Sequence, residues 1–597
     1  MIGGVLMLLM DVAPTGRLDR PCREANLLPI LVKSQQFELP CRIREPAPTG
    51  SLAAWAWWAL PSRPRCLQRL DDSTMPTLHW RGKDAVLNHH LAVPYHVLRC
   101  DSERSAGTPG SGNLIVEGDN LAALKALLPY YKGQVKCIYI DPPYNTGNEG
   151  WVYNDNVSSP EIRGWLGQVV GKEAEDLNRH DKWLCMMWPR LKLLKEYLTQ
   201  DGVLFISIDD QEVARLRLLC DDVFGSTAFV AQLVWKARQH LDSRAVSGIS
   251  TDHEYVLVYS PTKGRALAGK PRDEAKYKNP DGDGRGDWMS RSILGLASIA
   301  QRPNLHYPLI DPATGRAFPC PANTGWRYSK ETMAGKIADA RILFPAKANG
   351  RPREKVFLAD LQTTAPGFPS VIDGIFTADG TAEVRGIFGS GVFNFPKPSD
   401  FVADLIAQAS GPGDLVLDSF AGSGTTGHAV LKLNQRDGGG RRFILIEMDR
   451  TIAQDITAER VRRVANGYLN ATGGATAGLG GGFRYCSLGA PLFDPLGGLN
   501  PGVSREALAH HLFFTETGEP LSTPVPMTGP LIGTVDDRAF YLFFDPENGS
   551  VFDDEALATL PSFDGERVVF ADACQLPDSF LTAARVTFKQ VPYDVRG

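Results

Sequence analysis

The sequence predicts an α/β fold with a mostly parallel sheet, on the evidence of three short apolar runs. These runs occupy Cys137–Ile140, Asp414–Asp418 and Phe443–Ile446, and each has the length of a buried strand. The second run leads into a glycine-rich loop and then into a helix-like stretch, His428–Leu433. Because open α/β sheets bind ligands at the carboxyl ends of their strands, the residues that follow these runs are the candidate functional residues.

The first run is followed directly by Asp141, Pro142, Pro143 and Tyr144. The Asp141 carboxylate can accept hydrogen bonds from an exocyclic amine. The prolines have no N–H donors, which leaves their carbonyls free to accept. The Tyr144 ring offers a face for stacking. These residues suit a pocket for a flat base that carries an amine, and the structural alternative is a proline-rich turn after a strand.

The second run is followed by Gly422, Gly424 and Gly427, which match the pattern G-x-G-x-x-G. Such glycines permit a tight turn and a close approach of the backbone to a ligand, at a helix N-terminus with free N–H groups. The third run ends in Glu447, about 20 residues further on, where a carboxylate can accept from ribose hydroxyls. A nicotinamide or flavin dinucleotide would fit this loop as well. A hydride-transfer enzyme, however, has no use for the amine-binding turn at Asp141, whereas a methyl-transfer enzyme needs both.

Together, DPPYNTG (141–147) and DSFAGSGTTGHAV (418–430) resemble the β-group of amino-methylating DNA methyltransferases, in which the catalytic motif precedes the cofactor motif. The sequence is most similar to the modification subunit of type III restriction–modification systems, from near Leu78 to the C-terminus. Further matching segments are NLIVEGDN (113–120), HDKWLCMMWPRL (180–191), DGVLFISIDDQE (201–212), FPKP (395–398) and GFRYCSLG (482–489).

The resemblance implies a Rossmann-like methyltransferase fold with permuted motif order. Its sheet would have seven strands, mostly parallel with one antiparallel, and the two motif strands would be neighbours. A target-recognition domain would be inserted, and a small C-terminal α+β domain would follow.

The resemblance also implies a role for each matching residue. Asp141 and the Pro142 carbonyl would accept from the target amine, Tyr144 would stack on the base, and Pro143 completes the catalytic motif. S-adenosylmethionine would be bound by Asp418, Phe420, Gly422, Gly424, Thr425, Glu447, Lys397 and Pro398, with Glu447 on the ribose.

Two positions depart from the family pattern. The family usually has Asn-Pro-Lys-Pro where this chain has Phe395 at the first position, and often has Phe where this chain has Ser419. Both departures leave the details of the cofactor contacts open.

The implied reaction is methyl transfer from S-adenosylmethionine to adenine N6 in DNA, after the base is flipped out of the stack. Hydrogen bonds to Asp141 and Pro142 would localise the amine lone pair, so no covalent enzyme intermediate is needed. Cytosine N4 is the alternative target, because the motif DPPY accompanies adenine mostly but not always. The alternative from another class is a DNA-recognition subunit without activity, and an RNA or protein methyltransferase would share the cofactor half.

The resemblance implies double-stranded DNA as substrate, a homodimer, and a separate restriction subunit with helicase and nuclease activities. The sequence contains no phosphate loop of the form G-x-x-x-x-G-K-[ST] and no nuclease constellation, so restriction would need another chain.

Composition fits a globular protein of several domains, with 597 residues, 43% of them hydrophobic and 22% charged. The net charge is −5, but 22 Lys and Arg face 16 Asp and Glu between Ala231 and Ser390, a local excess of +6. Ten cysteines without a C-x-x-C pair predict reduced thiols, no structural metal and a cytoplasmic location. The apolar run Gly4–Met10 is too short to span a membrane.

We expect five segments along the chain. They are an extension outside the resemblance, poorly structured or preceding the true start (1–75), the catalytic half (76–225), the target-recognition insertion (226–390), the cofactor half (391–472), and a glycine-rich link with a small mixed domain (473–597).

Overall fold

The computed structural model describes residues 78–107, 111–146 and 178–594, except 244, 246, 265–266, 271, 348, 362–365, 522–523 and 527. The expected N-terminal extension therefore lies outside the described residues.

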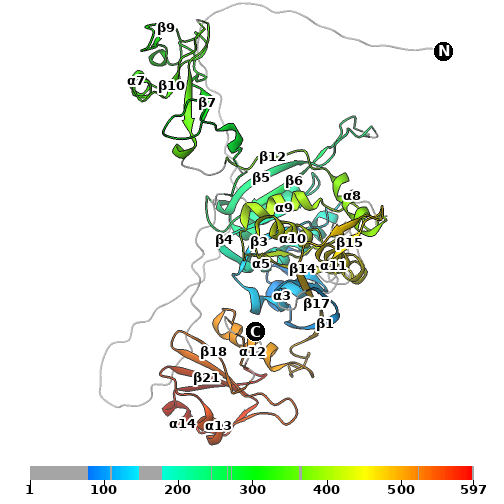
Figure 1. Ribbon diagram of the computed structural model, residues 1–597. Coiled ribbons are helices and arrows are strands. Elements are labelled where there is room, and N and C mark those ends of the chain that lie inside the picture. Colours follow the sequence, from blue (N-terminus) through cyan, green and yellow to red (C-terminus); the bar gives the residue numbers. More distant parts are fainter. Residues whose placement is uncertain are drawn as a thin grey trace, which may run out of the picture. The chain divides into compact units, whose positions relative to one another are not determined.

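A ten-stranded sheet forms the centre of the fold (Figure 1). Its strands are, in spatial order, β1 (His96–Gly107), β17 (Gly482–Pro491), β2 (Leu114–Glu117), β14 (Arg442–Glu447), β13 (Leu415–Asp418), β3 (Val135–Ile140), β4 (Leu198–Ile208), β6 (His253–Tyr259), β5 (Phe229–Lys236) and β12 (Val371–Ile372). From β2 to β5 these strands are parallel except β6, which runs antiparallel between β4 and β5. The predicted seven-stranded sheet with one antiparallel strand is confirmed, and β1, β17 and β12 extend it.

The two motif strands are neighbours, as predicted. Strand β3 pairs in parallel with β13, with Cys137 opposite Val416 and Ile138 opposite Leu417. Since parallel strands end at the same edge of a sheet, this pairing brings Asp141 and the glycine-rich loop together.

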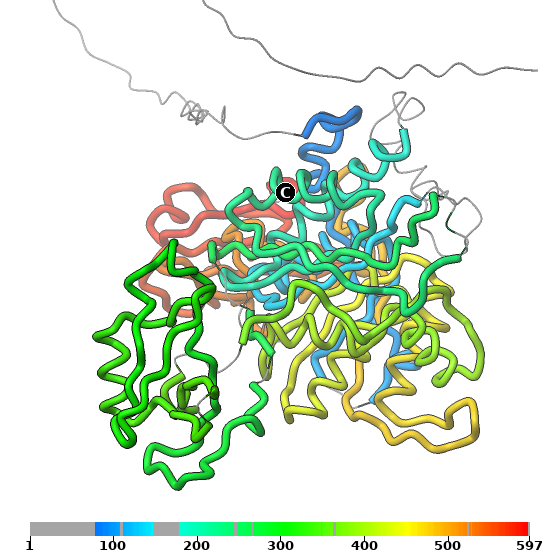
Figure 2. The backbone as a smooth tube through the Cα atoms, turned by 90° about the horizontal axis from the view of Figure 1, so that it is seen from above, coloured from blue at the N-terminus to red at the C-terminus, as the bar shows by residue number. Residues whose placement is uncertain are grey.

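Helices cover both faces of this sheet, which explains why its central strands β2, β14, β13 and β3 are mostly buried and apolar. Ile138 and Ile140 pack in a core with helices α3 (Asn120–Tyr131), α5 (Arg179–Tyr197) and α6 (Val213–Phe224). Cys137 and Tyr139 face the opposite core, which is formed with α9 (Ser399–Ala409), α10 (Thr425–Asp437) and α11 (Glu459–Asn466). Figure 2 shows these last three helices, in yellow, on one side of the cyan and green strands. The short helices α1 (Lys83–Val86) and α2 (His89–Ala92) precede β1.

The inserted module is smaller than the expected range 226–390. Strands β5, β6 and β12 belong to the main sheet, and α8 (Thr377–Phe388) packs on the cofactor half. Leu233 and Val256 are buried in the sheet core, which the composition of the segment 226–390 does not reveal.

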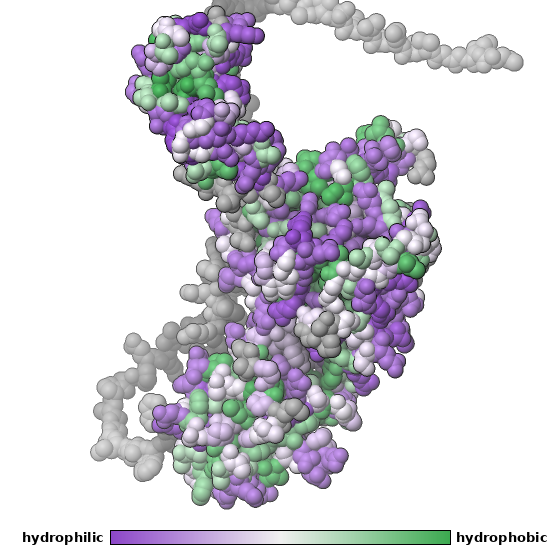
Figure 3. Space-filling view, in the orientation of Figure 1, coloured by the Kyte–Doolittle hydropathy of each residue, from purple (hydrophilic) through white to green (hydrophobic). Residues whose placement is uncertain are grey.

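The remaining module has its own three-stranded sheet and its own small core. Its elements are β7 (Trp288–Ser292), β8 (Leu309–Ile310), β9 (Ala317–Phe318), α7 (Lys330–Ala338), β10 (Ile342–Leu343) and β11 (Arg353–Phe357). Trp326 and Met333 are fully buried in its core. Figure 3 shows hydrophilic residues over much of its surface and a hydrophobic area between them.

The glycine-rich link expected at the start of the segment 473–597 contains paired strands. Ala475–Ala477 (β16) pairs antiparallel with Gly467–Leu469 (β15), and Gly482 begins β17 of the main sheet. Glycine is required here by close packing, since a Cβ on Gly478 would lie 2.4 Å from the carbonyl oxygen of Ala465.

The C-terminal domain is the predicted small α+β domain. Its sheet has the order β18 (Leu531–Val535), β19 (Arg538–Leu542), β21 (Glu566–Ala571), β23 (Val586–Gln590), of which the last three are parallel. The other elements are α12 (Arg505–Thr517), β20 (Val551–Phe552), α13 (Asp554–Thr559), β22 (Ala573–Cys574) and α14 (Asp578–Ala583).

The prediction that the thiols are reduced is wrong for one pair. Cys100 and Cys486 face each other across β1 and β17 and form a disulfide. They are 386 residues apart in sequence, so only the strand pairing brings them together. Among the described residues, no helix is long and apolar enough to cross a membrane, and no cluster of His, Cys, Asp or Glu could hold a metal ion.

Candidate active site

A cavity of about 690 Å³ lies at the carboxyl ends of β3 and β13. The residues that line it include these predicted site residues: Asp141, Pro142, Tyr144, Lys397, Asp418, Phe420, Gly422 and Thr425. Four predicted residues are not among the described residues that line it: Pro143, Pro398, Gly424 and Glu447. The Pro143 carbonyl instead accepts a hydrogen bond from Trp183 Nε1 (2.6 Å) on α5, which fixes the turn after β3.

Asp141 forms an ion pair with Lys397 in the cavity. Lys397 Nζ lies 2.9 Å from each carboxylate oxygen of Asp141 and donates to the Tyr144 hydroxyl at 2.8 Å. Its side chain is 9% exposed. Asp141 and Tyr144 of the catalytic motif and Lys397 of the motif before the cofactor loop thus form one hydrogen-bonded cluster.

Glu254, in β6, also belongs to this cluster, and sequence analysis missed it. Its Oε2 accepts from the Tyr144 hydroxyl (2.9 Å) and lies 3.3 Å from Lys397 Nζ. Glu254 lies in the range expected for the recognition insertion (226–390), outside the expected catalytic half. The local pattern that could have indicated Glu254 is a carboxylic acid near the start of the mostly apolar strand β6.

The charges in this cluster support one another. Burial by itself would lower the pKa of Lys397, but the carboxylates of Asp141 and Glu254 outweigh burial and raise it above its ordinary value. Burial, followed by the same two carboxylates, raises the pKa of Tyr144 well above its ordinary value. Lys397 is therefore a cation and Tyr144 a neutral phenol at neutral pH.

The glycine-rich loop after β13 has the backbone conformation that its sequence predicts. Gly422 and Gly424 have φ angles of 50° and 78°, which a residue with a Cβ adopts only with strain. Asp418 accepts from the Phe420 N–H (2.9 Å) and from Thr426 Oγ1 (2.5 Å), so its side chain holds the loop against the N-terminus of α10. Burial raises the pKa of Asp418 to about 7.

Glu447 lies behind this loop rather than in the cavity lining. Its carboxylate accepts from the N–H groups of Gly422 (2.8 Å) and Asp449 (2.9 Å), and burial raises its pKa to about 7. Both oxygens already hold backbone groups, so the structure gives Glu447 a role in shaping the loop. Contact with a ribose stays a prediction.

Arg460, a fully buried residue of α11, is a second residue that sequence analysis missed. It donates to Ser423 Oγ (2.8 Å), Thr425 Oγ1 (2.9 Å) and Glu383 Oε2 (3.2 Å). Thr425 Oγ1 in turn donates to the Lys397 carbonyl (3.2 Å). The glycine-rich loop and the segment that carries Lys397 are thus joined, and no sequence pattern marked Arg460 for this role.

The cavity is acidic. Among the residues that the structure describes, its charged lining residues are the carboxylates Asp141, Asp209, Asp210, Asp252, Glu254 and Asp418 and the cations Arg238 and Lys397. A lining with excess negative charge attracts cationic ligands and repels phosphates. This electrostatic character disfavours a dinucleotide with a pyrophosphate, the rival ligand of the glycine-rich loop.

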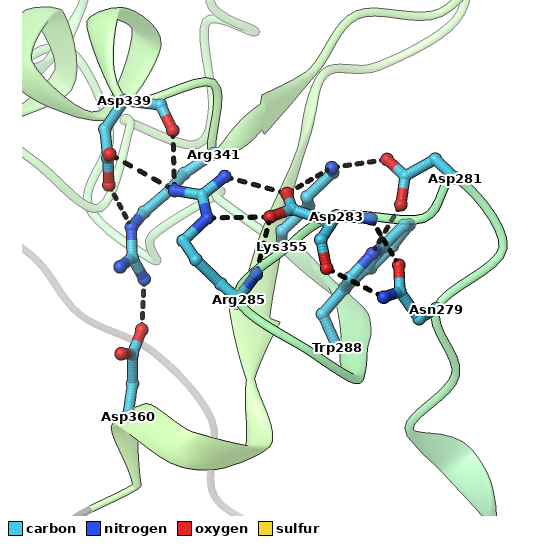
Figure 4. Close-up of polar contacts among 9 residues, drawn as sticks. All are labelled: Asn279, Asp281, Asp283, Arg285, Trp288, Asp339, Arg341, Lys355 and Asp360. Carbon is cyan, nitrogen blue, oxygen red and sulfur yellow. Dashed lines mark hydrogen bonds and ion pairs between the residues drawn. The ribbon is translucent and has the colours of Figure 1, made fainter.

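Many cations of the inserted module are paired with carboxylates (Figure 4). Lys355 contacts Asp283 at 3.0 Å, and Arg285 lies 2.8 Å from Asp283 and 3.1 Å from Asp339. Arg341 is also paired with Asp339. The local charge excess of this region therefore overstates the positive charge that it presents to a polyanion.

Comparison with known proteins identifies relatives of one kind. A family model described as DNA methylase matches residues 135–459. The EcoPI Mod subunit, from a type III restriction-modification enzyme of Escherichia phage P1, is 32% identical over 418 residues, which cover 63% of this chain and 64% of the relative. The type II methyltransferase M.KpnI of Klebsiella pneumoniae is 32% identical over 381 residues, 59% of this chain and 87% of the relative.

Among solved structures, the cytosine-N4-specific PvuII DNA methyltransferase aligns with 59% of this chain and 86% of its own, at 14% identity and a TM-score of 0.30. The chain spans just under two thirds of the length of the type III relative that it matches.

Proposed function

The chain belongs to the DNA methylase family, and from that premise we propose that it methylates double-stranded DNA. The methyl donor is S-adenosylmethionine, and the acceptor is adenine N6, with cytosine N4 as the alternative. The observation that carries the proposal is the single cavity in which Asp141 of the amine-binding motif and Gly422 of the glycine-rich loop meet.

The residues of the cavity have complementary tasks in this reaction. The target base must leave the duplex to reach them. Asp141 and the Pro142 carbonyl accept from its exocyclic amine, and the Tyr144 ring provides a stacking surface. These contacts localise the nitrogen lone pair and orient it, and orientation of reacting groups supplies much of the rate. When bound, S-adenosylmethionine would supply an electrophilic methyl group and would leave as S-adenosylhomocysteine. The carboxylate of Asp141, which accepts from the amine, is placed to take the proton that the amine gives up.

The acidic lining supports a cationic methyl donor. A sulfonium carries a positive charge, and Asp418 places a carboxylate beside the glycine-rich loop. The loop itself offers backbone N–H groups at the start of α10 for polar groups of the ligand.

The relatives support a proposal for the partners of the protein. The EcoPI relative is named as the Mod subunit of a type III restriction-modification enzyme. We infer that this chain acts as a modification subunit in the cytoplasm, as a homodimer, with a separate restriction subunit. The preference for adenine rests on the Asp141 motif.

Transfer of label from tritiated S-adenosylmethionine to duplex DNA tests the activity directly. We expect incorporation into host DNA that lacks this modification. Methylation-aware sequencing of the product then identifies both the modified base and its sequence context. Tight cofactor binding without any incorporation would contradict the proposal and favour a recognition subunit without activity.

Cofactor affinity should increase between pH 6 and pH 8. Asp418 and Glu447 have pKa values raised to about 7 by burial, so both hold protons below that pH in the free protein. A cationic ligand favours the ionised carboxylates, and we expect about a tenfold gain in affinity for each carboxyl that must ionise. Calorimetric titration in two buffers of different ionisation enthalpy would count the protons released.

The same two pKa values act on folding in the opposite sense. In the unfolded chain both carboxyls ionise near pH 4, as ordinary acids do, so these groups lower the free energy of unfolding as pH rises from about 4 to 7.

Equal cofactor affinities at pH 6 and pH 8, without proton release on binding, would contradict the predicted link between cofactor binding and carboxyl ionisation. The variant Asp418→Asn should flatten the pH dependence of cofactor affinity if the ionisation of Asp418 contributes to it.

A further inference from the structure

In the structure the acceptor proposed for the target amine is already occupied. Both carboxylate oxygens of Asp141 accept from Lys397 Nζ at 2.9 Å. Lys397 is buried and charged, so it stays close to a carboxylate, because an unpaired buried cation is costly. An amine that is to donate to Asp141 must therefore compete with this lysine.

A second carboxylate lies within reach of the same cation. Glu254 Oε2 lies 3.3 Å from Lys397 Nζ, only slightly beyond the distances from Nζ to Asp141 and Tyr144. A shift of a few tenths of an ångström would turn this contact into a full charge-assisted hydrogen bond. Lys397 can thus move between two anions without losing its charge partner.

The Tyr144 hydroxyl connects Glu254 with Lys397 in a fixed direction. It donates to Glu254 Oε2 (2.9 Å) and accepts from Lys397 Nζ (2.8 Å). Glu254 therefore also sets the direction of the Tyr144 O–H bond, at the residue assigned to base stacking.

Building on the proposed function, we propose that Glu254 is a positioning residue for the methyl-transfer site. It takes over Lys397 when the target amine enters, which frees an oxygen of Asp141 to accept from that amine. The three side chains carry two negative charges and one positive charge, so one carboxylate can always bind the lysine while the other binds the base. Without the charge of Glu254, Lys397 stays on Asp141 and the amine loses its acceptor.

The test compares the full-length protein with its Glu254→Gln variant, which keeps the side-chain size and an acceptor for Tyr144 but removes the charge. The probe is a duplex that carries the sequence found by methylation-aware sequencing of the product. A second duplex replaces the target base with its analogue that lacks the exocyclic amine. Both are bound in the presence of S-adenosylhomocysteine, and binding of that nucleoside verifies the fold of each variant.

We expect Glu254→Gln to weaken binding of the amine-containing duplex by about ten- to hundredfold and to lower single-turnover methyl transfer by a similar factor. Affinity for the analogue duplex should stay within about twofold, since no amine competes there. The matched control is Glu196→Gln in α5, which removes the charge that pairs with Lys132 at 3.3 Å. It should change neither the affinity for the amine-containing duplex nor the rate of methyl transfer.

A second variant checks that the effect acts through Lys397. Adding Lys397→Met to Glu254→Gln removes the competing cation, so selective binding of the amine-containing duplex should recover. Equal losses on both duplexes, no loss on either, or no recovery in the double variant would each overturn the proposal. Absence of methyl transfer by the unmodified protein would instead refute the proposed function.

Discussion

The variant Asp141→Ala is expected to lower methyl transfer by roughly a thousandfold, the scale found when one preorganised hydrogen-bonding group is removed from an active site. The affinity for S-adenosylmethionine should remain within about twofold, because the loop contacts of Gly422, Asp418 and Thr425 do not involve Asp141. The change thus separates chemistry from cofactor binding.

The loss has two physical components. Alanine removes the carboxylate that accepts from the target amine, so the nitrogen lone pair stays delocalised in the ring. It also leaves Lys397 with Glu254 as its remaining anion, at 3.3 Å in the present structure. A positive charge would then face an amine that becomes positive as the methyl group transfers.

Single-turnover transfer of labelled methyl groups and calorimetric cofactor titration measure the two quantities separately. The variant Asp141→Asn is the matched control for shape, since it keeps the side-chain volume and one acceptor oxygen while losing the charge. We expect an intermediate rate for it. Unchanged turnover in Asp141→Ala would refute the assigned role, and a parallel loss of cofactor affinity would assign Asp141 to the cofactor site instead.

The parts of the site that sequence could predict lie where a local pattern meets a general rule. The apolar runs before Asp141, before the glycine-rich loop and before Glu447 are strands β3, β13 and β14. They read as strands because both faces of the sheet are covered by helices. Their adjacency followed from the rule that ligand sites of open sheets lie at carboxyl strand ends.

The parts that sequence could not predict depend on contacts between distant elements. Glu254 reaches Tyr144 because β6 lies beside β4 in antiparallel orientation. Arg460 joins the site because α11 packs against α10. The disulfide between Cys100 and Cys486 needs β17 to return to β1 across the whole chain. Each of these contacts depends on how distant strands or helices pack together, which no local sequence spacing encodes.

The second large effect is expected from Gly380→Ala in α8. A Cβ at this position would lie 2.1 Å from the Pro396 carbonyl oxygen and 2.9 Å from the backbone carbon of Lys397. These are backbone atoms, so they cannot rotate away as a flexible side chain would. Either α8 or the segment that carries Lys397 must move.

That segment has little freedom to absorb the change. Phe395 has a φ angle of 50° directly before a proline, a strained conformation that persists only where its surroundings enforce it. Ser399 is held by Glu383 of α8, with its N–H donating at 3.0 Å, and the Lys397 carbonyl is held by Thr425. Displacement would therefore be passed to Lys397 Nζ, and from there to Asp141.

We expect methyl transfer by Gly380→Ala to fall by about a hundredfold, because misplacement of a reacting group by an ångström has that scale. The free energy of unfolding should fall by about 1–3 kcal/mol, the usual cost of overpacking. The matched control is Gly386→Ala in the same helix, where a Cβ would meet open space. It should leave activity unchanged and raise the free energy of unfolding by up to about 1 kcal/mol, because alanine favours a helix more than glycine does. Chemical denaturation measures the free energy of unfolding of both variants, and single-turnover transfer measures their activity. Equal activities of Gly380→Ala and Gly386→Ala would show that the approach of α8 to Pro396 does not position Lys397.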